Sequence, residues 1–372
     1  MNKRIRIGLI GCGKVAVNKH LPALQSLREA EVVAAADVDS ERLDHVTHAF
    51  QIEKRFVDYA DLLQDPAVEA VGICVPLQFH FEVASAALDA GKHVLLEKPL
   101  VMSLDEADQL IERAANTDRK VLVGLNKRWH RLVRQAREMV RGGKLGPVRV
   151  INAIHATGHH KRYMPAWRLH RELGGGNLIE NGTHWYDMWH FFLGSDVKEV
   201  FAVSGASEEE DDEPCIVTGQ TADGVFLNCV LSDLLPDQNE IEILGQEAIL
   251  RVSLHRFDGL ESIPLHSCAG DLRNRLANMA QLFKTLPHKV LQGRHGGDYN
   301  ASFRVQWQHF IDCIQQDKPV ECTLEDGRRA LQVALAAVLS ANTGRPVKVA
   351  QAPRQILPVL RDDTKIAAGR DE

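Results

Sequence analysis

Short apolar runs alternate with longer amphipathic stretches over the first 125 residues of the chain. The apolar runs lie at 5–10, 31–37, 70–75, 93–97 and 121–125, and helical spacing is found at 81–90 and 104–116. Strands that are apolar on both faces and alternate with helices are typical of a parallel sheet covered on both sides. Residues 1–125 are therefore predicted to form a doubly wound α/β domain, with a first helix that breaks near Pro22.

After residue 126 the pattern changes to helices mixed with strands of alternating polarity. The expected elements are a helix over 132–143 that ends at Gly142, a strand over 148–155, a glycine turn at 174–176 and a helix over 178–193. Successive antiparallel strands are expected at 198–205, 214–221, 225–231, 240–244 and 248–252. The acidic run 208–213 is expected to be a solvated hairpin loop. Residues 126–350 are predicted to form an α+β domain.

Three helices are predicted in the last third of the chain. A packed or covering helix is expected over 271–286, where the apolar positions are Leu272, Leu276, Met279 and Phe283. Further helices are expected over 300–316 and 328–341, and a tail over 351–372. Thr323 and Asp326 have the spacing of a capping box ahead of the second of these helices, with Asp in place of the usual Glu.

Composition narrows the class of protein. The 372 residues include 25% charged and 45% hydrophobic side chains with a net charge of −6, as in a globular protein of two or three domains. This charge balance predicts that nucleic acid is not a partner. The sequence contains no run of about 18 apolar residues, so no membrane span is predicted. The first residues lack a signal-peptide core, and the seven cysteines show neither CxxC pairs nor zinc spacing. We expect a cytoplasmic protein with reduced thiols and no metal site.

A G-x-G-x-x-A pattern directly follows the first strand, at residues 11–16. Gly11 would permit a tight turn, Gly13 would let the backbone approach a pyrophosphate, and Ala16 would let the helix pack closely on the strand. Free N–H groups at the start of the helix would attract the phosphates. The residues expected to contact the cofactor are Gly11, Cys12, Gly13, Lys14 and Val15. A strand-to-helix turn without a ligand is the alternative.

The second strand ends at Asp37. A carboxylate at this position can accept hydrogen bonds from both ribose hydroxyls, and its charge would repel a 2′-phosphate. Asp39 adds to that repulsion, and no arginine follows Asp37 immediately. The expected cofactor is NAD in preference to NADP; the alternative is that Asp37 only forms a turn at the end of the strand.

Two further loops are expected at the carboxyl ends of strands, where doubly wound sheets bind ligands. One contains Val75 and Pro76 and leads to His80, and the other contains Glu97 and Lys98. All five residues are expected to lie at the cofactor. Lys98 would then lie beside the nicotinamide, although a lysine at a strand end can also be merely solvated.

The glycine run at 174–176 is followed by Glu180 and His184, which are spaced to share one face of a helix. Histidine titrates near neutrality, so its imidazole can accept a hydroxyl proton and later return it. A carboxylate one turn away could hold that imidazole. The alternatives are a surface Glu–His pair and a metal site, for which no third ligand of recognisable spacing follows.

With these residues in place, the chain resembles the Gfo/Idh/MocA family (glucose–fructose oxidoreductase, inositol dehydrogenase and rhizopine catabolism). The resemblance covers roughly residues 4–350, and its motifs lie at 11–13, 36–39, 97–99, 124–128 and 174–187. It implies an N-terminal Rossmann domain and a C-terminal domain with a large, mostly antiparallel open sheet. It also implies a homodimer or homotetramer in which these sheets pack face to face.

The same resemblance assigns roles to residues. Lys98 matches the catalytic lysine of the family and His184 its proton-transferring histidine, whereas Glu180 stands where the family usually has Asp. Segments that border the substrate pocket of the family contain Asn126, Lys127, Trp167 and Arg168. With Lys98, Glu180 and His184, these four are the expected substrate contacts.

The leading hypothesis is an NAD-dependent dehydrogenase that oxidises a secondary hydroxyl of a sugar, a sugar derivative or an inositol-like cyclitol. A second hypothesis is an NAD-dependent glycosidase that works by oxidation, elimination and reversal of the oxidation. A third is a non-catalytic regulatory protein that senses a dinucleotide. The hypotheses differ in whether cofactor is consumed, cycled or only bound.

Overall fold

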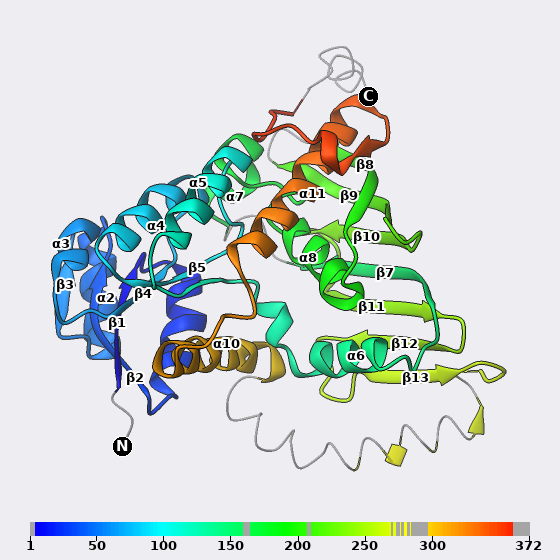
Figure 1. Ribbon diagram of the computed structural model, residues 1–372, viewed down its shortest axis with the longest axis horizontal. Helices are drawn as coiled ribbons and strands as arrows, with labels where there is room; N and C mark the ends of the chain where they lie inside the picture. The colour runs from blue at the N-terminus through cyan, green and yellow to red at the C-terminus, as the bar shows by residue number, and fades with distance from the viewer. Residues whose placement is uncertain are drawn as a thin grey trace, which may run out of the picture.

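The computed structural model describes residues 4–158, 164–206, 210–268 and 297–359, together with positions 271, 272, 276, 279, 280 and 283. Two sheets form the frame of the molecule, six-stranded in the first half and eight-stranded in the second (Figure 1).

The first sheet is parallel throughout. Its strands are β1 (Ile5–Ile10), β2 (Ala30–Ala36), β3 (Lys54–Phe56), β4 (Ala70–Ile73), β5 (His93–Leu96) and β6 (Val121–Val123), in the order β3-β2-β1-β4-β5-β6. This is the strand order of a Rossmann sheet, so the predicted α/β class is confirmed. The edge strand β3 was not predicted because its three residues include Lys54 and Arg55 and form no apolar run.

The helical elements of the first half are η1 (Ala16–His20), α1 (Leu21–Gln25), α2 (Ser40–Phe50), α3 (Tyr59–Gln64), η2 (Leu77–Phe79), α4 (His80–Asp89) and α5 (Leu104–Ala115). The predicted break near Pro22 does not occur, since the chain stays helical from residue 14 to residue 25. Pro22 lies at the beginning of α1, where a missing N–H is tolerated, directly after the π-helical turn η1.

The second sheet confirms the predicted large, mostly antiparallel architecture. Its strands are β7 (Val148–Ala156), β8 (Val197–Ala206), β9 (Asp211–Thr221), β10 (Phe226–Ser232), β11 (Gln238–Gly245), β12 (Ala248–Ser253), β13 (Leu260–Pro264) and β14 (Val347–Lys348), in the order β13-β12-β11-β7-β10-β9-β8-β14. The expectation that successive strands pair is wrong at one place, because β7 lies between β10 and β11 and runs parallel to β10. Local alternation marks a strand but does not choose its partner.

The helical elements of the second half are η3 (Asn126–Trp129), α6 (Arg131–Arg141), α7 (Ala166–Leu169), η5 (Arg171–Leu173), α8 (Gly182–Leu193), α10 (Gly297–Gln316), α11 (Leu324–Thr343) and η6 (Val349–Gln351). Helix α10 returns to the first half, where Phe303, Trp307 and Phe310 join the core of the Rossmann sheet. Helix α11 runs between the two sheets and contacts α5 and β6 on one side and α8 and β8 on the other (Figure 1). The two halves are therefore packed together through α11.

The predicted solvated loop at 208–213 is wrong for the residues of that run that the structure describes. Residues 210–213 are buried, and Asp211–Thr221 form β9. The Asp212 carboxylate is fully buried and forms an ion pair with Arg171 of η5. The run was misread because its counter-charge comes from a residue 41 positions away. Residues 208 and 209 lie outside the described part of the chain.

Two other predictions fall partly outside the described residues. The helix expected at 271–286 is described at six positions, and its apolar side chains Leu272, Leu276, Met279 and Phe283 are exposed. The expected tail begins packed against α5, because the N–H of Leu104 donates to the carbonyl of Arg354 and the Arg354 side chain pairs with Asp105 and Asp108. Residues 360–372 lie outside the description.

Candidate active site

The glycine loop has room for a ligand where the sequence expects a pyrophosphate. At Gly11, φ is +90° and an added Cβ would lie 2.7 Å from the carbonyl of Cys74, so only glycine fits. At Gly13, an added Cβ would meet nothing within 4 Å. Ala16 is fully buried and packs in one cluster with Leu9 of β1. The turn, the open approach and the close packing all fit a bound dinucleotide.

Cys12 turns inward. Its N–H donates to Asp37 Oδ2 at 2.7 Å, and its side chain is buried. Burial, with Asp37 nearby, raises the pKa of the Cys12 thiol to about 12. Through its N–H, Cys12 holds the loop to the end of β2, and its expected contact with the cofactor stays a prediction. The next residues, Lys14 and Val15, begin the helix, exposed and half-buried respectively.

Asp37 has an arginine partner that sequence inspection missed. Arg42 Nη1 lies 3.3 Å from both carboxylate oxygens of Asp37, and Arg42 Nη2 lies 2.8 Å from Asp39 Oδ2. Asp39 caps α2 by accepting from the Arg42 N–H, and this cap turns the side chain back toward Asp37. An arginine at this position can accommodate a 2′-phosphate. The argument for NAD that rested on the absence of arginine is therefore weaker than expected.

His80 connects the two other loops at the sheet edge. Its Nδ1 lies 2.9 Å from the carbonyl of Pro99, and its Nε2 lies 3.0 Å from the carbonyl of Val75. The ring is buried, and burial lowers the pKa of His80 despite these contacts. His80 thus lies between the loop of Val75 and Pro76 and the segment after Lys98, and a neutral ring can donate to one of the two carbonyls. Its contact with the cofactor stays a prediction.

Glu97 belongs to a buried chain of hydrogen bonds that the sequence did not reveal. Trp307 Nε1 donates to His20 Nδ1 at 3.0 Å, and His20 Nε2 donates to Glu97 Oε1 at 2.9 Å. The second carboxylate oxygen of Glu97 accepts from the Lys98 N–H at 3.2 Å. Helix α10, the π-helical turn η1 and the end of β5 are thereby joined directly beneath Lys98. Both carboxylate oxygens of Glu97, an expected cofactor residue, accept hydrogen bonds in this chain, one from His20 and one from the Lys98 N–H.

Lys98 and Arg168 converge on Glu180. Lys98 Nζ donates to Glu180 Oε1 at 2.6 Å and to the Glu180 carbonyl at 3.0 Å. Arg168 Nη2 donates to the other carboxylate oxygen at 3.0 Å. Burial by itself would raise the pKa of Glu180, but Arg168 and Lys98 lower it to about 2. The structure thus unites three predicted site residues from distant parts of the chain in one ionised cluster.

The glycine run places Arg168 in this cluster. An added Cβ at Gly175 would lie 2.2 Å from the Arg168 carbonyl, so the two backbones touch. The N–H of Gly176 donates to the same carbonyl at 2.9 Å. The glycines are needed because they let the segment before α8 fold against α7.

The predicted pairing of Glu180 with His184 is wrong. Helix α8 begins at Gly182, and Glu180 lies in the turns before it. The Glu180 carboxylate binds the two cations, whereas His184 Nδ1 is buried without a hydrogen-bond partner in the described part of the chain. Burial first, and then Lys98 and Lys127, hold the pKa of His184 well below its ordinary value. The imidazole is therefore neutral at neutral pH, the form that accepts a proton.

The remaining predicted substrate residues differ in their surroundings. Asn126 is buried and donates to Ser302 Oγ of α10 at 3.1 Å. Lys127 is buried over the ring of Trp185, within electrostatic reach of Lys98 and Glu180. Trp167 is half-buried on α7, next to Arg168. Lys127 therefore lies at the cluster, and Asn126 fixes α10 against η3.

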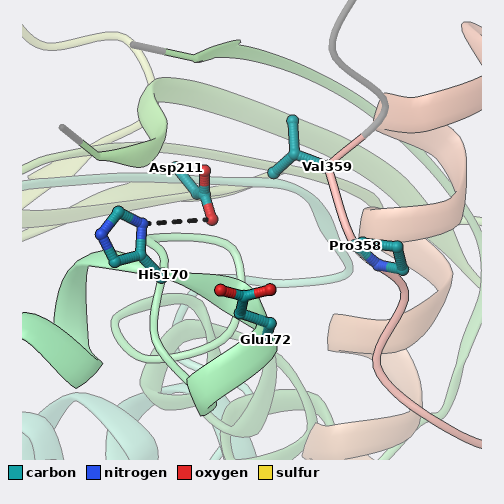
Figure 2. A pocket seen from close by; sticks show the side chains of 5 residues that line it. All are labelled: His170, Glu172, Asp211, Pro358 and Val359. Carbon is teal, nitrogen blue, oxygen red and sulfur yellow. Dashed lines mark ion pairs between the residues drawn. The ribbon is translucent and has the colours of Figure 1, made fainter. Parts of the chain in front are cut away.

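A cavity of about 310 Å³ lies between η5 and the last described residues. Figure 2 shows its lining side chains, which are His170, Glu172, Asp211, Pro358 and Val359. The ion pair drawn there joins His170 Nδ1 to Asp211 Oδ2 over 3.9 Å. None of the lining residues is a predicted site residue, so this cavity is not counted as part of the active site.

Neither a metal centre nor a membrane span is found in the described residues. No three His, Cys, Asp or Glu side chains gather there in an arrangement that could hold a metal ion. None of the helices of that part is both long enough and apolar enough to cross a bilayer.

Two family models match the chain and together cover most of it. One, described as the oxidoreductase family with NAD-binding Rossmann fold, matches residues 5–125. The other, described as the oxidoreductase family C-terminal alpha/beta domain, matches residues 137–349. The chain belongs to the Gfo/Idh/MocA family of oxidoreductases, and the resemblance drawn from its motifs is confirmed.

Named relatives and structures fit this membership. The chain is 33% identical to 1,5-anhydro-D-fructose reductase of Ensifer adhaerens over 366 residues, covering 92% of this chain and 98% of the relative. It is 27% identical to myo-inositol 2-dehydrogenase of Thermotoga maritima over 354 residues, covering 93% and 98%. Levoglucosan dehydrogenase, solved with NADH and levoglucosan, has the same fold, with a TM-score of 0.80, 20% identity and coverage of 94% and 100%.

Proposed function

We propose that this chain is an NAD-dependent dehydrogenase that oxidises a secondary hydroxyl of a sugar, a sugar derivative or a cyclitol. The observation that carries the proposal is the buried cluster in which Lys98, Glu180 and a neutral His184 lie together. The cluster begins at the carboxyl end of β5, in the sheet whose glycine loop leaves room for a dinucleotide. The names of the two curated relatives, an anhydrofructose reductase and an inositol dehydrogenase, support this substrate class.

Each residue of the cluster has a distinct task in this reaction. Lys98 donates a hydrogen bond to the substrate oxygen and offsets the negative charge that develops on it. His184 accepts the hydroxyl proton, because its buried imidazole is neutral. Glu180 orients the Lys98 ammonium and holds Arg168 at the same site. NAD, when bound, supplies the hydride acceptor.

We propose NAD as the preferred cofactor on the strength of Asp37. Its carboxylate lies at the end of β2 and is held by the N–H groups of Cys12 and Asp39, at 2.7 and 2.9 Å. A carboxylate fixed by backbone donors suits the ribose hydroxyls. Arg42 weakens the preference for NAD because its positive charge offsets the negative charge of Asp37. Replacing Arg42 therefore tests this assignment.

The test is direct. Purified protein is given NAD or NADP with a panel of polyols, cyclitols and neutral and acidic sugars, and the absorbance of reduced cofactor is followed. We expect turnover with at least one member, strongly reduced in Lys98→Met and His184→Asn but kept in Lys144→Met, a change at an exposed lysine. Absence of turnover in either direction on every member would sink the proposal. Release of an aglycone without net cofactor reduction would replace it with a glycosidase.

We also propose a homo-oligomer, homodimer or homotetramer, formed through the outer face of the second sheet. The exposed apolar side chains Phe201, Val203 and Ile216 lie on adjacent strands β8 and β9, and Val203 is directly paired with Ile216. Phe226 of β10 is also exposed. An apolar patch of this kind marks an interaction surface. Light scattering of wild type and Ile216→Lys tests it, with a monomeric wild type as the contrary result.

A further inference from the structure

The second lysine of the site, Lys127, is buried, and the partners of its Nζ in the described part of the chain are neutral. It is 2% exposed. Its Nζ lies 3.3 Å from His155 Nδ1, 3.3 Å from Asn239 Oδ1 and 3.9 Å from the centroid of the Trp185 ring. Burial and Lys127 itself hold the pKa of His155 well below its ordinary value, so His155 is neutral too.

Lys127 is the basic residue of this cluster that has no carboxylate partner. Glu180 is bound by Lys98 and Arg168, and Asp233 lies 3.8 Å from Arg168. The buried Glu213 carboxylate accepts from the Asp233 N–H at 2.8 Å and from Asn177 at 2.6 Å. Among the residues that the structure describes, no carboxylate forms an ion pair with Lys127. A negative group in contact with its Nζ is therefore missing.

An unmatched buried ammonium is unfavourable, because burial removes water without supplying a counter-ion. Burial and the nearby Lys98 accordingly hold the pKa of Lys127 well below its ordinary value. A ligand that brings one negative charge to Nζ would favour the protonated form and supply the missing counter-ion. The group must arrive with the ligand, since the neighbouring His155 and Asn239 are both uncharged.

We infer that the substrate is a sugar acid, whose carboxylate binds Lys127 while its reacting hydroxyl lies between Lys98 and His184. This inference rests on the proposed dehydrogenase function and narrows its substrate class. A carboxylate supplies one negative charge to the one ammonium that lacks a carboxylate contact, whereas the dianion of a phosphate monoester would bring a second charge into a buried site. The reaction at the hydroxyl is unchanged, and the carboxylate takes no part in it.

Matched substrate pairs test the inference on the full-length protein with NAD. The probes are D-glucuronate and D-galacturonate against D-glucose and D-galactose, with D-glucose 6-phosphate as the phosphate arm. We expect kcat/KM for a uronate to exceed that of its neutral parent at least tenfold. Lys127→Met should lower this ratio at least tenfold, and Lys144→Met should leave it unchanged. A neutral sugar or the sugar phosphate used as well as or better than the uronates would overturn the inference.

Binding to the wild-type protein gives a second measurement that does not depend on how the variant folds. Titration calorimetry of the uronates and of their neutral parents should show uronate binding that is at least tenfold tighter. Uronate binding that is no tighter than that of the parent sugars counts against the inference. Tight uronate binding with no cofactor reduction on any sugar would overturn the dehydrogenase and leave the carboxylate site standing.

Discussion

Asp37 and Glu180 are both buried carboxylates with basic partners, yet they are held in different ways. Asp37 accepts from two backbone N–H groups and from Arg42, whose side chain is 48% exposed. Glu180 lies between Lys98 and Arg168, whose side chains are 11% and 23% exposed. One carboxylate is fixed mainly by the backbone, and the other is fixed by two largely buried charges.

The difference determines what each carboxylate contributes. An ion pair with a half-exposed arginine is screened by water and worth little. A buried carboxylate between two cations cannot be removed without leaving charges uncompensated. We therefore expect changes near Glu180 to affect both catalysis and stability, and changes near Arg42 to affect mainly the choice of cofactor.

The largest effect is expected from Lys98→Met. This change removes the hydrogen-bond donor that stabilises charge on the substrate oxygen, so kcat should fall by roughly 10²–10³. Steady-state kinetics on whichever substrate proves active measures it, with circular dichroism to confirm that the variant is folded. A decrease of less than threefold would show that the ammonium does not contact the reacting group.

Glu180→Gln and Asp37→Asn compare the two carboxylates directly. Glu180→Gln leaves Lys98 and Arg168 without their shared counter-ion and should lower the free energy of unfolding by about 3 kcal/mol. Asp37→Asn keeps an oxygen acceptor for a backbone N–H and should cost about 1 kcal/mol. Urea denaturation of both variants and wild type measures the difference. Equal losses of unfolding free energy in the two variants would mean that the burial of Lys98 and Arg168 does not make Glu180 more important for stability than Asp37.

The pH dependence of the reaction tests the buried cluster more finely. Because the pKa of His184 lies well below 6.5, its imidazole stays unprotonated as the pH falls through 6.5. The rate of alcohol oxidation should not fall in a transition centred near pH 6.5. The loss of activity in acid should occur at a lower pH. Profiles with a substrate deuterated at the reacting carbon would verify that hydride transfer limits the rate. An inflection between pH 6.5 and 7 contradicts a buried, neutral base.

The smallest effect is expected from Arg42→Ala. Without this arginine the Asp37 carboxylate would repel a 2′-phosphate more strongly, so the preference for NAD over NADP should rise about threefold, or about 0.7 kcal/mol. The ratio of kcat/KM for the two cofactors is the measurement. Arg55→Ala removes an exposed arginine paired with Asp44 and serves as the control. An unchanged ratio would show that Arg42 lies away from the 2′ position.

Local patterns predicted the parts of the molecule that are locally determined. The strands β1, β4 and β5 are apolar on both faces because helices cover both sides of a parallel sheet, and that is visible in one dimension. Gly11 was read correctly because its φ of +90° is a property of a single residue. The capping box of Thr323 and Asp326 was likewise found within four positions and is present.

The environments of charged residues were predicted less well, because they depend on partners that can lie far away in the sequence. Asp212 appeared to be a loop residue until Arg171, 41 positions earlier, was found beside it. Glu180 was assigned to His184 by spacing, but its carboxylate binds Lys98, which is 82 residues away. Arg42 is only five positions from Asp37, yet it was missed because the cap at Asp39 turns its side chain backward.

The sequence alone determined the kind of fold, the glycine turn after the first strand and the side chains that are candidates for the chemistry. These follow from backbone freedom, helical and strand periodicity and side-chain type, which act over a few residues. Only the tertiary structure decided which charges meet, that α10 returns to the first core, and that Lys127 is buried with no carboxylate contact among the described residues. Coulomb interactions depend on distances in space, and burial depends on the exclusion of water. Neither quantity can be obtained from the order of the residues alone.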